Sequence, residues 1–215
     1  MNWITAFDQE ALDVWHNFVK QEQLTEHQAD QFGQYLTRLI EFSKKTNLTT
    51  ITSIPLIISD HFQDSLHLGH TIPMTAELTL CDIGSGAGFP GIPLAIKYPE
   101  IQMILLEVNN KKVAFLQMII DELGLTNCSI DSSDFRLLLR HSSLAIDYFL
   151  ARASLKPAEL MRIFSPHGAY HTATVVYWAS RYWEPTSKEL KYLYRQEPYV
   201  VDAKERRLIF FAVPK

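Results

Sequence analysis

The hydrophobic pattern of this chain changes character near residue 70. Before that point apolar side chains recur at helical spacing, and they give one apolar face to each of three segments, 7–19, 28–45 and 55–68. From Glu77 onward short apolar runs alternate with helical stretches, a rhythm typical of a parallel sheet with right-handed crossovers. We therefore expect a helical extension over residues 1–70 that packs on an α/β sheet domain over residues 71–215.

The sheet domain contains five predicted strands and a closing hairpin. The strands are expected over 78–83, 101–106, 128–130, 147–151 and 169–178, with helices over 111–123, over 135–140 and from Lys156 onward. The hairpin is expected from 198–201 and 206–213, joined by the polar turn 202–205. The sequence therefore predicts a mainly parallel, Rossmann-like sheet that ends in an antiparallel pair.

Half of the eight glycines lie between the first predicted strand and the helix that follows it, at positions 84, 86, 88 and 91. Pro90 and Pro93 can occupy the first turn of that helix, where a missing N–H costs little. Glycine is needed where φ is positive or where a ligand lies against the backbone, and the start of a helix adds unpaired N–H groups. An ordinary turn would not require four glycines, so this loop is predicted to bind a nucleotide-type ligand.

The residues of the glycine loop favour one class of ligand. Residues 86–91 match the dinucleotide pattern G-x-G-x-x-G, but Pro90 removes a donor where a pyrophosphate would sit. Asp82, at the start of the loop, suits a cationic ligand better than an anionic one. S-adenosylmethionine carries a sulfonium and an ammonium and no phosphate, and the spelling D-x-G-x-G-x-G is similar to motif I of the class I methyltransferases. We therefore expect S-adenosylmethionine as the cofactor, held at Gly84 and Gly86.

An acid stands at the end of the second predicted strand. Glu107 follows Gly84 by 23 residues, the position from which a carboxylate can accept hydrogen bonds from both hydroxyls of a ribose. The alternative is a surface acid beside Lys111 and Lys112. We favour the ribose role, and the neighbouring Val108 could supply an apolar wall for an adenine.

Small polar residues follow the third predicted strand, where open α/β sheets bind ligands. Ser132 and Ser133 lie between two aspartates in the segment 131–134. They could pair with the edge of an adenine, or the segment could simply cap the helix that starts at Phe135. The sequence does not separate these alternatives.

Arg152 comes directly after the fourth predicted strand and reaches the same edge of the sheet. Its guanidinium offers a planar fork to an anion, so we expect it to position a carboxylate of the substrate or the cofactor. The alternative is a structural ion pair with Asp147 or Glu159.

The predicted helix over 55–68 carries four polar residues of interest: His61, Asp64, Ser65 and His67. Their spacing matches no metal signature, so no metal site is predicted. We expect a capped or partly solvated helix face there.

Composition narrows the class of protein. With 47% hydrophobic and 20% charged residues the chain has the make-up of an ordinary soluble globular protein, and its net charge of −4 argues against coating nucleic acid by bulk electrostatics. No apolar run approaches membrane-spanning length, and residues 1–25 do not resemble a secretory signal. Cys81 and Cys128 lack metal-like spacing and are interpreted as free thiols of a cytoplasmic protein.

Several motifs resemble one family in register from about residue 30 to 153. They are Thr46-Asn47-Leu48-Thr49, then His61 and Asp64-Ser65-Leu66, then the run from Asp82 through Gly91-Ile92-Pro93-Leu94-Ala95, then Lys112-Val113-x-Phe115-Leu116, and Arg152-Ala153, with a weaker echo in Glu205-Arg206-Arg207-Leu208. This set is similar to the small-subunit ribosomal RNA guanine-N7 methyltransferases, also called the glucose-inhibited division protein B family. The proline- and glycine-rich run after the glycine motif is the most specific part.

The resemblance implies a class I methyltransferase fold with an N-terminal helical cap. It also implies an S-adenosylmethionine-dependent enzyme that methylates N7 of one guanine in 16S rRNA, in the free RNA or the small ribosomal subunit. By matching position, cofactor contacts would fall on Gly84, Phe89, Ser132, Ser133 and Arg152. Asn47, His61 and Asp64 would lie near the mouth of the active site, and Asn47 and Arg152 would position the substrate.

The chain departs from the family pattern at three places, one of which is a segment about two residues shorter after Arg152-Ala153. The Leu-Lys-Gly segment usual after the glycine at 168 is absent near Thr174, and Asp60 replaces an arginine that often precedes His61. Each change removes positive charge or flexibility from a surface expected to meet RNA. Two alternatives therefore stand beside the main interpretation: a methyltransferase of another substrate, or a module that binds S-adenosylmethionine or RNA without catalysis.

Overall fold

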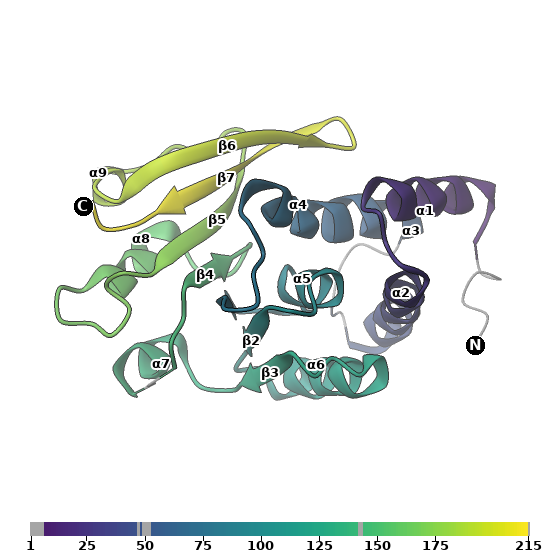
Figure 1. Cartoon of the computed structure of the whole chain (residues 1–215), viewed down its shortest axis with the longest axis horizontal. Helices are drawn as coiled ribbons and strands as arrows, with labels where there is room; N and C mark the ends of the chain where they lie inside the picture. The colour runs from purple at the N-terminus through teal and green to yellow at the C-terminus, as the bar shows by residue number, and fades with distance from the viewer. Residues whose placement is uncertain (1–6, 47, 49–52, 142–143, 215) are drawn as a thin grey trace.

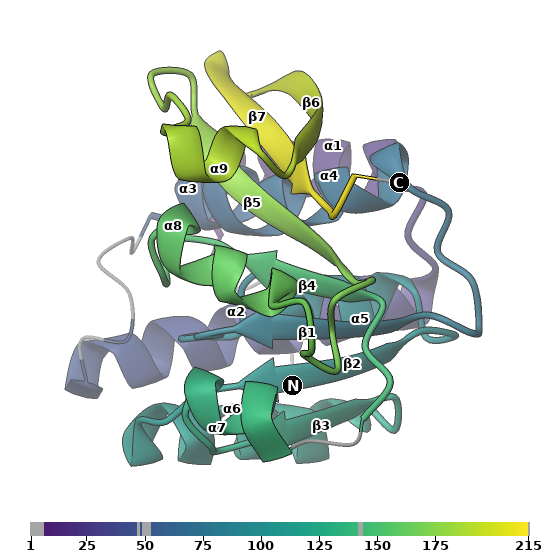
Figure 2. The same ribbon diagram turned by 90° about the vertical axis from the view of Figure 1, so that its left-hand side faces the viewer.

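The computed structural model describes the chain except for residues 1–6, 47, 49–52, 142–143 and 215. The described residues form a seven-stranded sheet with the strand order β3-β2-β1-β4-β5-β7-β6, and helices cover both of its faces (Figures 1 and 2). The predicted α/β class, with a mainly parallel sheet and an antiparallel C-terminal pair, is therefore confirmed. Asn47 lies outside the described residues.

Five strands of the sheet run parallel. They are β1 Thr79–Ile83, β2 Gln102–Leu106, β3 Cys128–Asp131, β4 Tyr148–Ala151 and β5 Thr174–Ser180. The last two strands, β6 Leu193–Val201 and β7 Lys204–Phe211, form the predicted hairpin, and β7 pairs antiparallel with β5. Cys81 in β1 is buried and Cys128 in β3 is half-buried, both as free thiols.

Two predicted boundaries were wrong in the C-terminal third. The fifth strand was expected over 169–178, but residues 168–173 form consecutive tight turns through the bonds Gly168 N–H to Ser165 C=O and Ala173 N–H to Tyr170 C=O, so the strand starts at Thr174. The hairpin is longer than expected because β6 already starts at Leu193 instead of residue 198, and its turn is shorter. Only Asp202 and Ala203 make the turn, both with positive φ, as two-residue hairpin turns require.

The helices divide between the two faces of the sheet. One face is covered by the N-terminal helices and by α5 Gly91–Lys97 and α6 Asn110–Leu123, and the other by α7 Phe135–His141, α8 Pro157–Leu160, the 3₁₀ turn Met161–Phe164 and α9 Ser187–Leu190 (Figure 1). Gly124 ends α6 in the left-handed conformation, as the sequence predicted. No helix within the described part of the chain is long and apolar enough to cross a membrane.

The three predicted N-terminal helical segments are present with shifted ends. Helix α1 spans Gln9–Gln21 and α2 spans Glu26–Thr46. The third segment is not one regular helix, because α3 Ile54–Ile57 widens into a π-helical stretch, Ile58–Gln63, before α4 Asp64–Thr71. Such widened turns are rare in proteins and often occur at functional sites.

The N-terminal helices and the glycine loop share one hydrophobic core. Phe18 of α1, Phe32 of α2 and Phe62 of the π-helical stretch form a chain of ring contacts with centroids 5.0–5.8 Å apart. Tyr35 continues this chain to Phe89, and its buried hydroxyl donates to the carbonyl oxygen of Ala87 at 2.6 Å. The helical segment is therefore tied directly to the loop of interest, and the division at residue 70 stays a prediction.

The Tyr35 bond gives a test of this tie. We expect Tyr35→Phe to lower the free energy of unfolding by about 1–2 kcal/mol, because the buried Ala87 carbonyl loses its donor while the packed ring remains. Chemical denaturation would measure it. Tyr194→Phe is the matched control, since Tyr194 is 58% exposed, and it should leave stability unchanged. Equal stability of both variants would contradict the role given to this bond.

Candidate functional site

The glycine loop lies at the carboxyl end of β1, the side of the sheet toward which the parallel strands point. Gly86 has φ +62°, and a Cβ there would find no heavy atom closer than 3.8 Å, so open space faces its backbone. Gly91 is required for the opposite reason, because a Cβ would stand 2.3 Å from Cδ2 of Leu105. The loop thus packs tightly on the sheet on one side and leaves backbone open on the other.

Asp82 fixes the turn from strand to helix. Its side chain is fully buried, and Oδ2 accepts a hydrogen bond of 2.9 Å from the backbone N–H of Gly91. Burial raises the pKa of this carboxyl from 3.8 to about 7. We interpreted Asp82 as an acid facing a cationic ligand, but the structure points it into the protein, where it holds the start of α5.

Glu107 braces the other end of the loop. Oε2 accepts from the N–H of Gly86 at 2.9 Å and Oε1 from the N–H of Asn109 at 2.9 Å, while Nζ of Lys112 lies 3.9 Å away. The residue is only 6% exposed, so the alternative of a surface acid was wrong. Each carboxylate oxygen keeps a second lone pair, so the ribose role stays a prediction. Val108 beside it is 58% exposed, as an apolar wall would be.

In the loop after β3 one residue caps the next helix, and the two serines do not. Asp134 accepts from the N–H of Arg136 at 2.8 Å through its side chain and so caps α7, while Asp131 accepts from the N–H of Ser133 at 2.8 Å. Ser132 is exposed and Ser133 half-buried at the same carboxyl edge. Asp134 is therefore the residue that caps α7. The roles of Ser132 and Ser133 in binding a ligand stay predictions.

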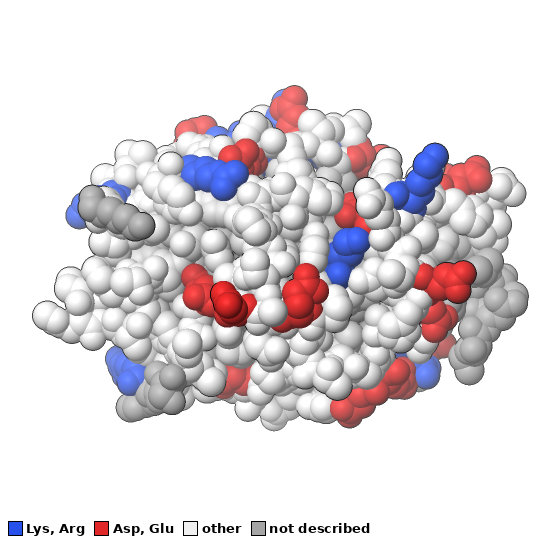
Figure 3. Space-filling model, in the orientation of Figure 1, with Lys and Arg blue, Asp and Glu red and all other residues white. Residues whose placement is uncertain are grey.

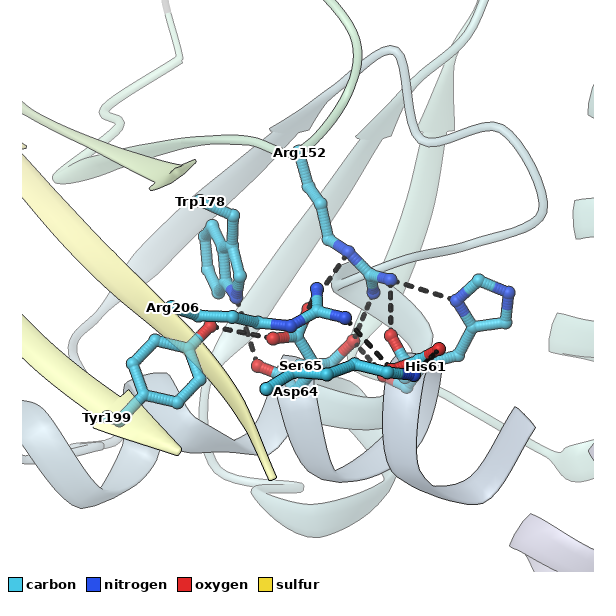
Figure 4. Close-up of polar contacts among 9 residues, drawn as sticks. His61, Asp64, Ser65, Arg152, Trp178, Tyr199 and Arg206 are labelled. Carbon is cyan, nitrogen blue, oxygen red and sulfur yellow. Dashed lines mark hydrogen bonds and ion pairs between the residues drawn. The ribbon is translucent and has the colours of Figure 1, made fainter. Parts of the chain in front are cut away.

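Arg152 follows β4 and turns toward the π-helical stretch (Figure 4). Its Nε lies 3.1 Å from Oδ2 of the fully buried Asp64, and its terminal nitrogens donate to the Ser65 hydroxyl at 3.2 Å and the Asp60 carbonyl at 2.5 Å. The alternative of a structural ion pair named the wrong partners, Asp147 or Glu159. In this structure the guanidinium of Arg152 already pairs with a carboxylate of its own chain. Its role in binding a ligand stays a prediction.

Asp64 is the centre of a buried network, and its expected place on a capped or partly solvated helix face was wrong. Besides Arg152, it pairs with Nη1 of Arg206 at 3.3 Å and accepts from the hydroxyl of Tyr199 at 2.7 Å. The indole N–H of Trp178 donates to its backbone carbonyl at 3.0 Å (Figure 4). One residue thus joins α4 to the end of β4 and to β5, β6 and β7.

Asp60, where the family often has arginine, belongs to the same network. Its carboxylate accepts from Nζ of Lys204 at 2.7 and 2.9 Å and from Nη2 of Arg206 at 2.9 Å. The two cations lie with Leu208 on one face of β7, which turns them toward the π-helical stretch. The acid at residue 60, where the family often has arginine, is therefore paired with two cations from the C-terminal hairpin of the same chain.

His61 packs flat on Phe89 of the glycine loop, with ring centroids 4.4 Å apart and planes inclined by 18°. Burial, with the nearby Arg152 charge, lowers its pKa from 6.5 to about 4. Arg152 can only donate, so Nδ1 of His61, 2.9 Å away, is the acceptor and the ring is neutral with its proton on Nε2. His61 and Phe89 thus add a second contact between the helical segment and the glycine loop, beside the one made by Tyr35.

Sequence reasoning missed Tyr199 and Trp178 as partners of Asp64 and gave no role to Lys204. The period-two spacing of positions 204, 206 and 208 was the available signal, because it places Lys204 and Arg206 on the face that also carries Leu208. No group of three or more metal-ligating side chains is found among the residues whose placement is described.

Comparison with known proteins identifies relatives of one kind. The family model GidB, described as rRNA small subunit methyltransferase G, matches residues 28–211. Proteins named ribosomal RNA small subunit methyltransferase G include one from Staphylococcus epidermidis, 42% identical over 107 residues (50% of this chain and 45% of that one), and one from Desulforamulus reducens, 41% identical over 136 residues (62% and 56%). The matched part of this chain spans about half the length of these curated relatives.

Solved structures show the same fold at low identity. A mutant of MtNAS superposes with a TM-score of 0.60 at 12% identity, covering 96% of this chain and 78% of that one. TrmK of M. capricolum, solved with S-adenosyl-homocysteine, superposes with a TM-score of 0.51 at 15% identity, covering 71% and 67%. These likenesses establish the fold alone.

The shifted pKa of Asp82 predicts a pH-dependent stability. Between pH 3.8 and about 7 the unfolded chain has released the Asp82 proton and the folded chain retains it, so the stability contributed at low pH is lost as pH rises toward 7. Asp82→Asn cannot titrate at this position and serves as the reference. Relative to it, the free energy of unfolding of the native protein should decrease by about 3 kcal/mol across this range. Urea denaturation of both proteins measures it, and a constant difference from pH 4 to 7 would contradict the assignment.

Proposed function

This chain belongs to the GidB family of rRNA small subunit methyltransferases G, and from that membership we propose that it transfers a methyl group from S-adenosylmethionine to N7 of a guanine in 16S rRNA. The observation that carries the proposal is the glycine loop, whose open backbone at Gly86 stands between Glu107 and the Arg152 network at the carboxyl edge of the sheet. This is the edge at which open α/β sheets bind ligands. Such an RNA-modifying enzyme would work in the cytoplasm on free rRNA or the small ribosomal subunit.

The chemistry of the described residues at this edge supports the cofactor. The backbone of Gly84 and Gly86 would lie against it, Glu107 would accept from its ribose hydroxyls, and the exposed Val108 would contact the adenine, with Ser132 and Ser133 at the edge of that ring. S-adenosylmethionine supplies an electrophilic methyl group on a sulfonium. Phe89 would face the same ligand from the far side of the loop, where His61 holds its ring.

The proposed reaction needs little help from acidic or basic side chains. N7 of guanine is a lone-pair acceptor that needs no deprotonation before it attacks a methyl carbon. The enzyme must therefore align the base and exclude water, and orientation alone can lower the barrier by about 7–11 kcal/mol. The neutral His61, and Arg152 paired with Asp64, support a site that positions its substrate without proton transfer.

The face of the molecule turned away from the carboxyl edge carries no continuous basic band (Figure 3). The parallel strands point to the left in Figure 2, away from the viewer of Figure 1, so Figure 3 shows the opposite, amino-end side. There cations are scattered among acids and wide neutral areas, with no continuous basic band (Figure 3). Residues 168–173, where the family's Leu-Lys-Gly segment is missing, precede β5 at this amino end, so that departure lies away from Gly86 and Arg152.

The activity is tested with labelled S-adenosylmethionine and small ribosomal subunits from cells that lack this protein. We expect one N7-methylguanosine at one position of 16S rRNA. Binding of S-adenosylmethionine without transfer to subunits or to free 16S rRNA would contradict the proposal and favour another substrate or a binding module.

Two glycines with the same backbone give a matched test of the cofactor site. Gly86 and Gly124 have φ of +62° and +64°, and a Cβ would have no heavy-atom neighbour within 3.8 Å at Gly86 and none within 4 Å at Gly124. Asparagine tolerates this conformation, so both variants should fold. Gly86→Asn should weaken S-adenosylmethionine binding at least tenfold in calorimetry, because its side chain fills the space of the ligand, whereas Gly124→Asn should bind normally. Equal affinities would place the cofactor elsewhere.

A further inference from the structure

A pocket of about 580 Å³ opens beside the Arg152 network, where β5 ends and β7 begins. Its aromatic and cationic lining is formed chiefly by Arg152, Tyr177, Trp178, Trp183, Lys204 and Arg206, and the carboxylates of Asp60 and Glu205 also line it. Tyr177 and Trp183 lie on the face of the sheet that carries Phe211, whereas Lys204 and Arg206 lie on the face that carries Leu208, so the pocket extends around the end of β5. The pocket adjoins the glycine loop, because the segment after Arg152 turns back through Ala153 to Ser154, whose Cβ lies 2.8 Å from the position of a Cβ on Gly84. An occupant of this pocket would therefore lie next to the proposed cofactor.

The aromatic wall is presented by a short loop that β7 holds in place. Trp183 and Tyr177 have ring centroids 5.6 Å apart, inclined by 57°, and both rings are half-buried. Arg207 donates to the carbonyl oxygens of Ser180, Arg181 and Trp183 and so fixes the loop. The indole of Trp183 thus lines the pocket while part of it packs on the core, where its ring meets the buried Phe211 edge-on with centroids 6.2 Å apart.

The cationic wall keeps donors for an anion. Lys204 is 44% and Arg206 25% exposed at the side chain, and Asp60 holds both in place. An ammonium has three N–H donors and a guanidinium five, so the contacts with Asp60 and Asp64 leave part of each set available. Asp60 orients these cations, and its own side chain is only 12% exposed.

We propose that this pocket holds one unpaired nucleotide of the RNA strand, with its base on Trp183 and Tyr177 and its phosphate on Lys204 and Arg206. Proteins hold single-stranded RNA by this combination, in which aromatic rings stack on a base and cations follow the backbone. The volume lies within the usual range for small-molecule sites. The inference rests on the proposed function for its choice of RNA.

The neighbouring Tyr182 extends the same surface. Its ring is 76% exposed, and the guanidinium of Arg181 lies over it at 4.6 Å from the centroid. A planar cation and a ring at the rim offer two more faces to the bases that flank the held nucleotide.

The test uses guanosine 5′-monophosphate as the probe and needs no turnover. Stacking on a base is worth about 1–3 kcal/mol, so Trp183→Ala should weaken binding about tenfold or more in calorimetry, and Trp183→Phe should restore most of it. Lys204→Gln should weaken binding of the nucleotide but not of guanosine, which has no phosphate. Tyr194→Ala and Lys188→Gln, at exposed positions outside the pocket, are the matched controls.

The outcomes separate this inference from the proposed function. If the native protein methylates subunits, Trp183→Ala and Lys204→Gln should raise KM for subunits while the affinity for S-adenosylmethionine is unchanged. If both variants bind the nucleotide with the affinity of the native protein, the proposed nucleotide pocket is wrong and the proposed methyl transfer is unaffected. If the native protein transfers no methyl group, the nucleotide titrations still decide the pocket, and thermal melting of each variant shows that it is folded.

Discussion

The structure depends on one buried carboxylate. Asp64 has no exposed surface and lies between the guanidinium groups of Arg152 and Arg206, with the hydroxyl of Tyr199 on its other oxygen. Removing one partner of such a buried pair typically costs about 3–5 kcal/mol, because the remaining charge is left uncompensated in a medium of low polarity. The network therefore forces α4, the edge after β4 and the C-terminal hairpin into one arrangement.

This constraint determines where the functional groups stand. With Asp64 fixed, the preceding π-helical stretch brings His61 onto Phe89, and Tyr35 reaches the backbone of Ala87 from the other side. The glycine loop is then braced on the sheet by Asp82 and Glu107, two buried acids that bond to backbone N–H groups. The loop keeps its backbone open at Gly86 because the helical segment, Asp82 and Glu107 each fix a part of it. The proposed nucleotide pocket uses the same Arg152 and Arg206 as a wall, so both proposed binding sites rest on the one network.

Sequence reasoning succeeded where the signal is local. The glycine spacing, the strand before it and Gly124 as the end of α6 depend on neighbours along the chain, and the structure confirms them. The network around Asp64 could not be predicted in this way, because its partners Arg152, Tyr199 and Arg206 come from distant segments that only the sheet order brings together. The start of β5 was misplaced because Tyr170 and Thr172 continue the Thr-, Val- and Tyr-rich run of the strand backward, whereas the backbone of residues 168–173 folds into turns. Ligand roles of Ser132, Ser133 and Arg152 remain predictions, since the contacts described for them are with the protein itself.

The most direct measurement is a crystal structure of the protein with S-adenosylhomocysteine, the product that the proposed reaction leaves behind. We expect the ligand to lie along residues 84–86 with its ribose hydroxyls on Glu107, its adenine beside Val108 and its sulfur on the side of Arg152 and the nucleotide pocket. A ligand bound elsewhere, or one that leaves the backbone at Gly86 uncovered, would contradict the claim that this edge of the sheet is the site of methyl transfer.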